Sequence, residues 1–117
     1  MTEQWLGTRL IEKRCIACEG DIDPLAEPMA DKYLEQVEGW EFNDTKTAIS
    51  RTFAFQDFKE TMSFVNAVAW VAESENHHPD LSVSYRCCDV LYQTHAIGGL
   101  TENDFICAAK INALLYI

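Results

Sequence analysis

The apolar residues of the segment 40–95 change their spacing twice, and this change constrains the fold more than any other feature. The stretches 40–43 (WEFN) and 47–55 (TAISRTFAF) are separated by a short polar stretch. In the second stretch two sets of residues alternate: Ile49, Arg51 and Phe53 with Ala48, Ser50 and Thr52. A period of two is typical of a β-strand with one buried face. The two stretches therefore predict a β-hairpin.

The spacing becomes helical in residues 56–75 and returns to a period of two after Pro79. One stripe marks the helix face that we expect to be buried: Phe58, Met62, Val65, Ala69 and Ala72. Proline cannot continue a helix and disfavours helical angles at the residue before it, so the helix should end ahead of Pro79. The runs 81–85 (LSVSY) and 89–95 (DVLYQTH) then predict a second pair of strands, joined by a turn that includes Cys87 and Cys88.

Two further helices complete the pattern. Residues 29–38 are amphipathic and precede Gly39, a residue that commonly ends helices. A last helix should run from Thr101 to about Leu115, and Thr101 and Asp104 have the spacing of a capping box. The order α-β-β-α-β-β-α predicts a two-layer α+β domain, with a four-stranded antiparallel sheet and helices packed on one face. The other face of the sheet and the final helix would remain for self-association.

Length, charge and terminal sequence limit the class of function. A chain of 117 residues is the size of one domain. We divide it into an N-terminal arm, residues 1–27, and a domain, residues 28–117. The net charge of −10 disfavours binding to nucleic acid or to an anionic membrane. The first residues lack the apolar run of a signal peptide, and no stretch of about 18 apolar residues occurs. We therefore expect a cytoplasmic protein without a membrane span and without direct contact to nucleic acid.

All three histidines fall where the ends of helices and strands meet the rim of the predicted sheet. His77 and His78 follow the long helix, and His95 ends the last predicted strand. Grouped imidazoles suit proton transfer, because the unperturbed histidine pKa of about 6.5 allows both donation and acceptance near neutral pH. Spacing alone leaves other interpretations open. His77 and His78 could complement the helix dipole, and His95 could be structural. Asp104 could serve only as a cap, and Glu73 could be a solvated helix residue.

The cysteines offer a competing interpretation. Cys15 and Cys18 form a C-x-x-C pair, a pattern found in zinc sites and in redox-active disulfides. A closed zinc site needs two further ligands, and the sequence holds no second C-x-x-C. A redox pair normally opens a helix that follows a strand, and no strand is predicted before Cys15. Cys107, inside the last helix, is expected in the core. Five cysteines, an odd number, without an export signal favour reduced thiols and leave the purpose of the pair open.

The segments 75–85 (ENHHPDLSVSY) and 90–105 (VLYQTHAIGGLTENDF) closely resemble the pterin-4a-carbinolamine dehydratase family. The signature of that family is His-His-Pro, then Thr-His on the second strand of the next hairpin, then Gly-Leu-(Ser/Thr)-x-x-Asp. All of these elements are present in order: His77, His78, Pro79, Thr94, His95, Gly99, Leu100, Thr101 and Asp104. The resemblance extends over about residues 27–115 and leaves the cysteines of the arm outside the signature.

The resemblance implies an α+β subunit that associates into homodimers or homotetramers and uses neither metal nor cofactor. The implied reaction removes water from 4a-hydroxytetrahydropterin and gives quinonoid dihydropterin. An aromatic amino-acid hydroxylase would be the functional partner that supplies this substrate during tetrahydropterin recycling.

The chemistry implied by the resemblance gives each histidine a role. The C4a hydroxyl is a poor leaving group, so His77 or His78 should protonate the departing oxygen, each serving one face of the pterin. His95 would orient the ring or assist proton movement at its nitrogens. Glu73 and Asp104 match acidic family positions, where nearby negative charge should hold the histidines and raise their pKa.

Two positions depart from some relatives, which carry Asp before the histidine pair and an aromatic residue a few positions after it. Here these positions hold Asn76 and Leu81, which should alter affinity for the ring more than the mechanism. Five residues are expected to bind substrate or support the histidines: Glu73, Asn76, Pro79, Thr94 and Asp104. Two rival functions remain. Some family members act as dimerisation cofactors for a transcription factor, and a pterin-related role in molybdenum-cofactor metabolism is the other.

Overall fold

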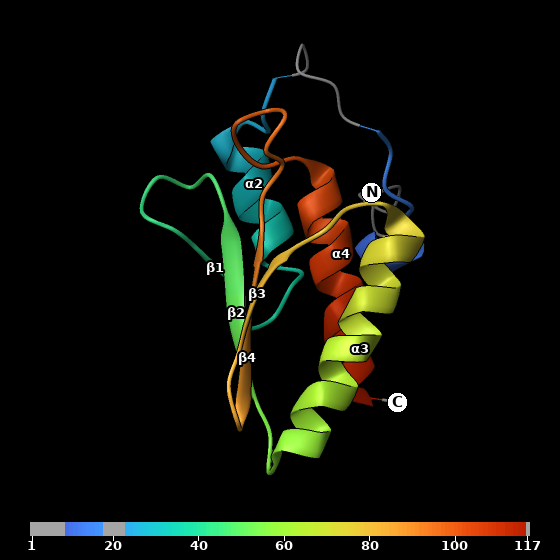
Figure 1. Ribbon diagram of the computed structural model, residues 1–117. Helices are drawn as coiled ribbons and strands as arrows, with labels where there is room; N and C mark the ends of the chain where they lie inside the picture. Colours follow the sequence, from blue (N-terminus) through green and yellow to red (C-terminus); the bar gives the residue numbers. More distant parts are fainter. Residues whose placement is uncertain (1–8, 18–22, 117) are drawn as a thin grey trace.

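The computed structural model describes residues 9–17 and 23–116, and its elements follow the predicted order (Figure 1). The helices are η1 (Leu10–Glu12), α2 (Glu27–Leu34), α3 (Phe58–Glu75), α4 (Glu102–Ala113) and η2 (Leu114–Tyr116), where η marks a short 3-10 helix. The strands are β1 (Glu41–Phe42), β2 (Ile49–Ala54), β3 (Asp80–Val83) and β4 (Cys87–Tyr92). The predicted α+β class is confirmed.

The four strands form one antiparallel sheet in the order β1-β2-β4-β3. Strands β2 and β4 are central and pair along six residues, from Ile49 opposite Tyr92 to Ala54 opposite Cys87. The prediction that Cys87 and Cys88 lie in a turn is wrong, because both begin β4. Cys88 is fully buried opposite Phe53, where a small apolar side chain suits the core face of a central strand.

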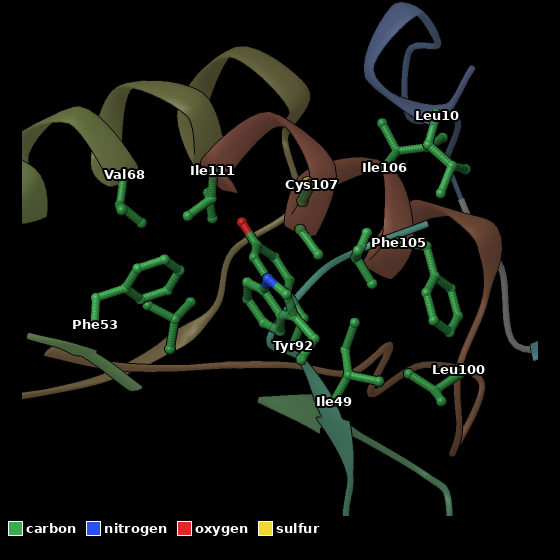
Figure 2. Packing of buried hydrophobic residues seen from close by; sticks show 14 of the residues in the cluster. Leu10, Ile49, Phe53, Val68, Tyr92, Leu100, Phe105, Ile106, Cys107 and Ile111 are labelled. Atoms are coloured by element: carbon green, nitrogen blue, oxygen red, sulfur yellow. The ribbon is translucent and has the colours of Figure 1, made fainter. Parts of the chain in front are cut away.

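Helices α3 and α4 cover one face of this sheet, and the core lies between the two layers (Figure 1). Figure 2 shows Ile49, Phe53 and Tyr92 of the sheet directed toward Val68 of α3 and Ile111 of α4. Helix α4 contributes seven of the buried residues, from Asn103 to Ile111. The expectation that the final helix remains for self-association is therefore wrong, because α4 is packed inside its own chain.

The buried face of α3 lies about one position further around the helix than the apolar stripe predicts. The residues that are buried are Thr61, Phe64, Val68, Ala72 and Glu75, so Ala72 alone belongs to both sets. Thr61 can be buried because the carbonyls of Asp57 and Tyr85, at 2.9 and 3.0 Å from its hydroxyl oxygen, share its one proton in a bifurcated hydrogen bond. Phe58 is 49 % exposed. A stripe of apolar residues therefore misplaces the buried face of α3, because polar residues such as Thr61 can also be buried when their polar atoms are hydrogen-bonded.

The described part of the arm packs against the domain. Leu10 is 2 % exposed and lies beside Ile106 of α4 (Figure 2). The backbone N–H of Cys15 donates to Glu75 Oε1 at 2.8 Å. The division into arm and domain stays a prediction, and Cys18 lies outside the described residues. No helix in the described ranges is long and apolar enough to cross a membrane.

Candidate active site

A cleft of about 380 Å³ lies beyond the C-terminal end of α3, where the chain enters β3 and leaves β4. Five of the predicted site residues line it: Asn76, His77, His78, Thr94 and His95. The structure therefore brings the three histidines together, as the sequence predicts.

The end of α3 directs the histidine pair into the cleft. Asn76 closes the helix in the left-handed conformation, with φ 54° and ψ 43°, which asparagine tolerates better than most residues. The N–H of His77 then donates back to the carbonyl of Ala72 at 3.1 Å. Tyr92 of β4 holds the backbone at His77, since its hydroxyl donates to the His77 carbonyl at 3.1 Å. Pro79 is half-buried outside the cleft lining and leads the chain into the extended strand β3.

His77 forms a buried pair with Asp104. Its Nε2 lies 2.6 Å from Asp104 Oδ1, and the two side chains are 12 % and 0 % exposed. Burial by itself would lower the pKa of His77, but the hydrogen bond to Asp104 and the charge of that carboxylate raise it above its ordinary value. The His77 ring also stacks on Tyr92, with ring centres 5.2 Å apart. His77 is thus a rigidly held imidazole with a strengthened hold on its proton.

Asp104 is itself held by the start of α4. Its Oδ2 accepts the hydroxyl of Thr94 at 2.9 Å and the backbone N–H of Thr101 at 3.0 Å. The bond from the Thr101 N–H is one of the two reciprocal bonds that make up the predicted capping box. Capping the helix and holding His77 use different oxygens of the same carboxylate, so the two interpretations of Asp104 are compatible.

His78 forms a second pair, in a different environment. Its Nε2 lies 2.9 Å from Oε1 of Glu73, one turn back on α3, and the two side chains are 56 % and 75 % exposed. Glu73 is therefore both a solvated helix residue and the partner of a histidine. The cleft combines one buried and one solvated histidine–carboxylate pair.

His95 lies in a turn beyond the end of β4, whereas the sequence predicted that it ends the last strand. Strand β4 ends at Tyr92, and an isolated bridge between Thr94 and Gly99 closes a turn that His95 begins. The side chain of His95 is exposed on the wall of the cleft. An exposed imidazole on a tight turn can contact a ligand without being part of the core.

Half of the cleft lining was not predicted from the sequence. The additional residues are Ile16, Ala17, Gln93, Ala96 and Asn103. Gln93 and Ala96 flank Thr94 and His95, and Asn103 precedes Asp104. Only their position next to a predicted site residue could have indicated that these three line the cleft. Ile16 and Ala17 belong to the arm, where no apolar period indicates burial. In residues 9–17 and 23–116, no three His, Cys, Asp or Glu side chains are grouped as metal ligands.

The sequence matches a known family model and several curated proteins. The model of the family described as pterin 4 alpha carbinolamine dehydratase matches residues 23–114. A protein of Nitrosomonas eutropha is 54 % identical over 107 residues, which is 91 % of this chain and 93 % of that protein. One of Nitrosomonas europaea is 55 % identical over 106 residues, 90 % and 92 % of the two chains. Both are provisionally named pterin-4-alpha-carbinolamine dehydratases.

Two solved structures share the fold. A transcriptional coactivator/pterin dehydratase from Brucella melitensis superposes with a TM-score of 0.75 at 36 % identity, covering 79 % of this chain and 98 % of that one. A pterin dehydratase-like protein described as a RuBisCO assembly factor in the alpha-carboxysome gives a TM-score of 0.58 at 22 % identity, covering 66 % and 89 %. The second comparison bears on the fold alone.

Proposed function

Because this chain belongs to the pterin 4 alpha carbinolamine dehydratase family, we propose that it dehydrates 4a-hydroxytetrahydropterin to quinonoid dihydropterin by histidine acid–base catalysis. The observation that carries the proposal is the buried pair of His77 and Asp104, in a cleft that also presents His78 and His95. Departure of the C4a hydroxyl as water requires a proton donor at that oxygen, and formation of the new double bond requires loss of a ring-nitrogen proton. Several imidazoles in one cleft can meet both requirements.

His77 suits the acid role. The charge of Asp104 raises its pKa, so a larger fraction carries a proton at neutral pH than for a free histidine. Asp104 holds Nε2, so Nδ1 is the ring nitrogen with which His77 would address a substrate. Stacking on Tyr92 fixes the orientation of the His77 ring. This favours proton transfer, because the donor is already oriented before the substrate binds.

His78 and His95 suit the remaining proton and binding steps. His78 is more solvated than His77, so it can exchange protons with water and protonate the opposite face of the ring. His95 and the lining residues Asn76 and Thr94 would orient the pterin. This assignment keeps Glu73 and Asp104 as residues that position histidines rather than as groups that touch the substrate.

The test follows the ultraviolet decay of 4a-hydroxytetrahydropterin that a hydroxylase generates in situ. The wild-type chain should accelerate the decay, and His77→Ala should lower the rate by roughly 10²–10⁴-fold. His78→Ala should lower the rate less than His77→Ala does when the substrate is the stereoisomer whose hydroxyl faces His77. Ser50→Ala, on the exposed face of β2, is the control and should match the wild type. A folded wild-type chain that leaves the decay unchanged would sink the proposal.

A second candidate function is a protein-interaction role. The Brucella melitensis protein, at 36 % identity, carries the names coactivator and pterin dehydratase together. Simultaneous replacement of His77, His78 and His95 separates the two functions. A biological role that survives this replacement would require binding rather than catalysis, whereas its loss together with the dehydratase rate supports the enzyme.

A further inference from the structure

Two cysteines that are far apart in the sequence meet beside the cleft. Cys15 Sγ of the arm lies 3.6 Å from Cys107 Sγ of α4, and the two residues are 92 positions apart. Cys107 is fully buried, whereas Cys15 is partly exposed and also contacts the carbonyl of Asn103. The proposed acid–base mechanism uses neither thiol.

We propose that Cys15 and Cys107 are an oxidation site, which forms a reversible disulfide that fastens the arm to α4. The arm is already held in register for this bond. The N–H of Cys15 donates to the buried carboxylate of Glu75 at 2.8 Å. The side chain of Asn103 accepts from the N–H of Ile16 at 3.1 Å and donates to its carbonyl at 2.6 Å. A disulfide bond is about 2.05 Å long, so the sulfur atoms need to approach by roughly a further 1.5 Å.

The chemistry requires a two-electron oxidant, and a peroxide supplies it. The peroxide oxidises the partly exposed thiol of Cys15 to a sulfenic acid and is itself reduced to one water molecule. The Cys107 sulfur then attacks the Cys15 sulfur, and the hydroxyl leaves with the Cys107 proton as a second water molecule. Two thiols and one peroxide thus give one disulfide and two waters, and a small dithiol reverses the bond by exchange.

The surroundings of the Cys107 sulfur agree with its role as the attacking thiolate. A hydrogen bond from the Cys15 thiol lowers the pKa of Cys107 against the effect of burial, with smaller contributions from Tyr92 and the charge of His77. The same hydrogen bond, together with burial, raises the pKa of Cys15. Cys107 is therefore the better nucleophile of the pair. Cys15 is the sulfur that an oxidant can reach from solvent, and its raised pKa makes that first oxidation slow.

The disulfide would fix one wall of the cleft. Ile16 and Ala17 follow Cys15 directly and line the cleft together with the histidines. In the reduced chain this wall is held by non-covalent contacts, which include the hydrogen bonds to Glu75 and Asn103. Oxidation should therefore narrow the range of positions that the wall samples. That consequence rests on the proposed function, whereas formation of the bond does not.

The experiment treats the folded chain with hydrogen peroxide and maps its disulfides by alkylation, digestion and mass spectrometry. We expect a link between the Cys15 and Cys107 peptides in the wild type and in Cys18→Ser, and its absence in Cys15→Ser. The linked chain should unfold at a melting temperature at least about 5 °C higher, and a dithiol should abolish the rise. A link between Cys15 and Cys18, or free sulfinic acids at either position, would overturn the proposal.

A kinetic comparison tests the consequence for the cleft separately. The KM for the pterin should change by about twofold or more between the oxidised and reduced wild type, and not in Cys15→Ser. If no chain accelerates pterin decay, the dehydratase proposal fails while the mapped disulfide stands. If the disulfide forms and KM is unchanged, the arm does not act on the cleft.

Discussion

Asp104 controls the charge of His77 at the scale of single residues. Its carboxylate is fully buried, lies 2.6 Å from His77 Nε2 and outweighs the effect of burying the ring. Asp104→Asn removes the charge and keeps the shape, so we expect the pKa of His77 to fall. Dehydration at neutral pH should slow by roughly 10²-fold, because less of the imidazole is protonated. An NMR titration of the His77 ring and the ultraviolet assay measure the two effects.

A matched control exists at the start of the other long helix. Asp57 caps α3 by accepting the N–H of Glu60 at 2.8 Å, and asparagine caps a helix about as well as aspartate. Asp57→Asn should therefore leave both the His77 pKa and the rate at their wild-type values. A slow Asp104→Asn enzyme with an unchanged His77 pKa would contradict the electrostatic explanation.

The sequence predicts the membership of the site better than its geometry. The grouping of His77, His78 and His95 follows from their positions at the ends of elements and from the family signature. That His77 is the buried member of the pair cannot be predicted from an adjacent His-His. It depends on Tyr92 lying beneath the ring and on Asp104 arriving from α4, and both are contacts between distant segments.

The contact between the arm and α4 is the element-scale feature that closes one side of the cleft. Asn103 is buried and makes two hydrogen bonds to the backbone of Ile16. Asn103→Ala should cost about 2 kcal/mol of unfolding free energy, at roughly 1 kcal/mol for each bond. Hydrogen exchange at the Ile16 amide should accelerate more than exchange in β4. Chemical denaturation and exchange detected by mass spectrometry measure both.

Asn66→Ala, on the exposed side of α3, is the control for that variant. Alanine favours helices more than asparagine does, so this chain should be as stable as the wild type or slightly more. If Asn103→Ala loses stability without faster exchange at Ile16, the side chain supports α4 itself and the arm is held by other contacts.

Element order was predictable because each element carries its own local pattern, whereas the contacts between elements were not. The period of two predicts β2, and Pro79 separates α3 from β3. The pairing of β2 with β4 joins residues that lie on either side of α3 in the sequence. Local alternation does not specify such a partner. The burial of Leu10 could not be predicted either, because one leucine in the arm does not form a periodic apolar pattern.

At the scale of the whole molecule, two buried ion pairs, Glu75 with Lys110 and His77 with Asp104, make stability depend on pH in opposite directions. Burial raises the pKa of Glu75, but bonds from the Cys15 backbone and Lys110 lower it overall. Its contribution is present above the unfolded pKa, about 4.5, and is lost as pH falls through the folded pKa. The pKa of His77 is raised, so its contribution is full below about 6.5 and is lost as pH rises through the folded pKa.

The free-energy difference between wild type and variant should therefore depend on pH with opposite signs. For Glu75→Gln the difference should shrink on acidification below about pH 4.5, and for Asp104→Asn it should shrink above about pH 6.5. Urea denaturation at several pH values measures both differences. Equal differences across the pH range would show that the two carboxylates stabilise the chain by shape and not by charge.

The edge strand β3 extends the core face of the sheet past the helices that cover it. Leu81 lies opposite Val90 and Val83 lies opposite Cys88, so these residues share a face with buried partners. Leu81 and Val83 are nevertheless 38 % and 40 % exposed. An apolar edge of this kind is a place where a second copy of the chain could pack, consistent with the homodimer or homotetramer that the family resemblance implies.

We therefore expect the 13.3 kDa chain to sediment as a dimer or larger assembly at micromolar concentration. Replacing both Leu81 and Val83 by Lys should raise the dissociation constant at least about tenfold, since the apolar contact is lost. The added lysines reduce the net charge of −10, so weaker association could not result from greater repulsion. Ser82→Lys, directed to the opposite face beside Asp89, should leave assembly intact. Analytical ultracentrifugation distinguishes the outcomes, and a monomeric wild type would exclude association through β3.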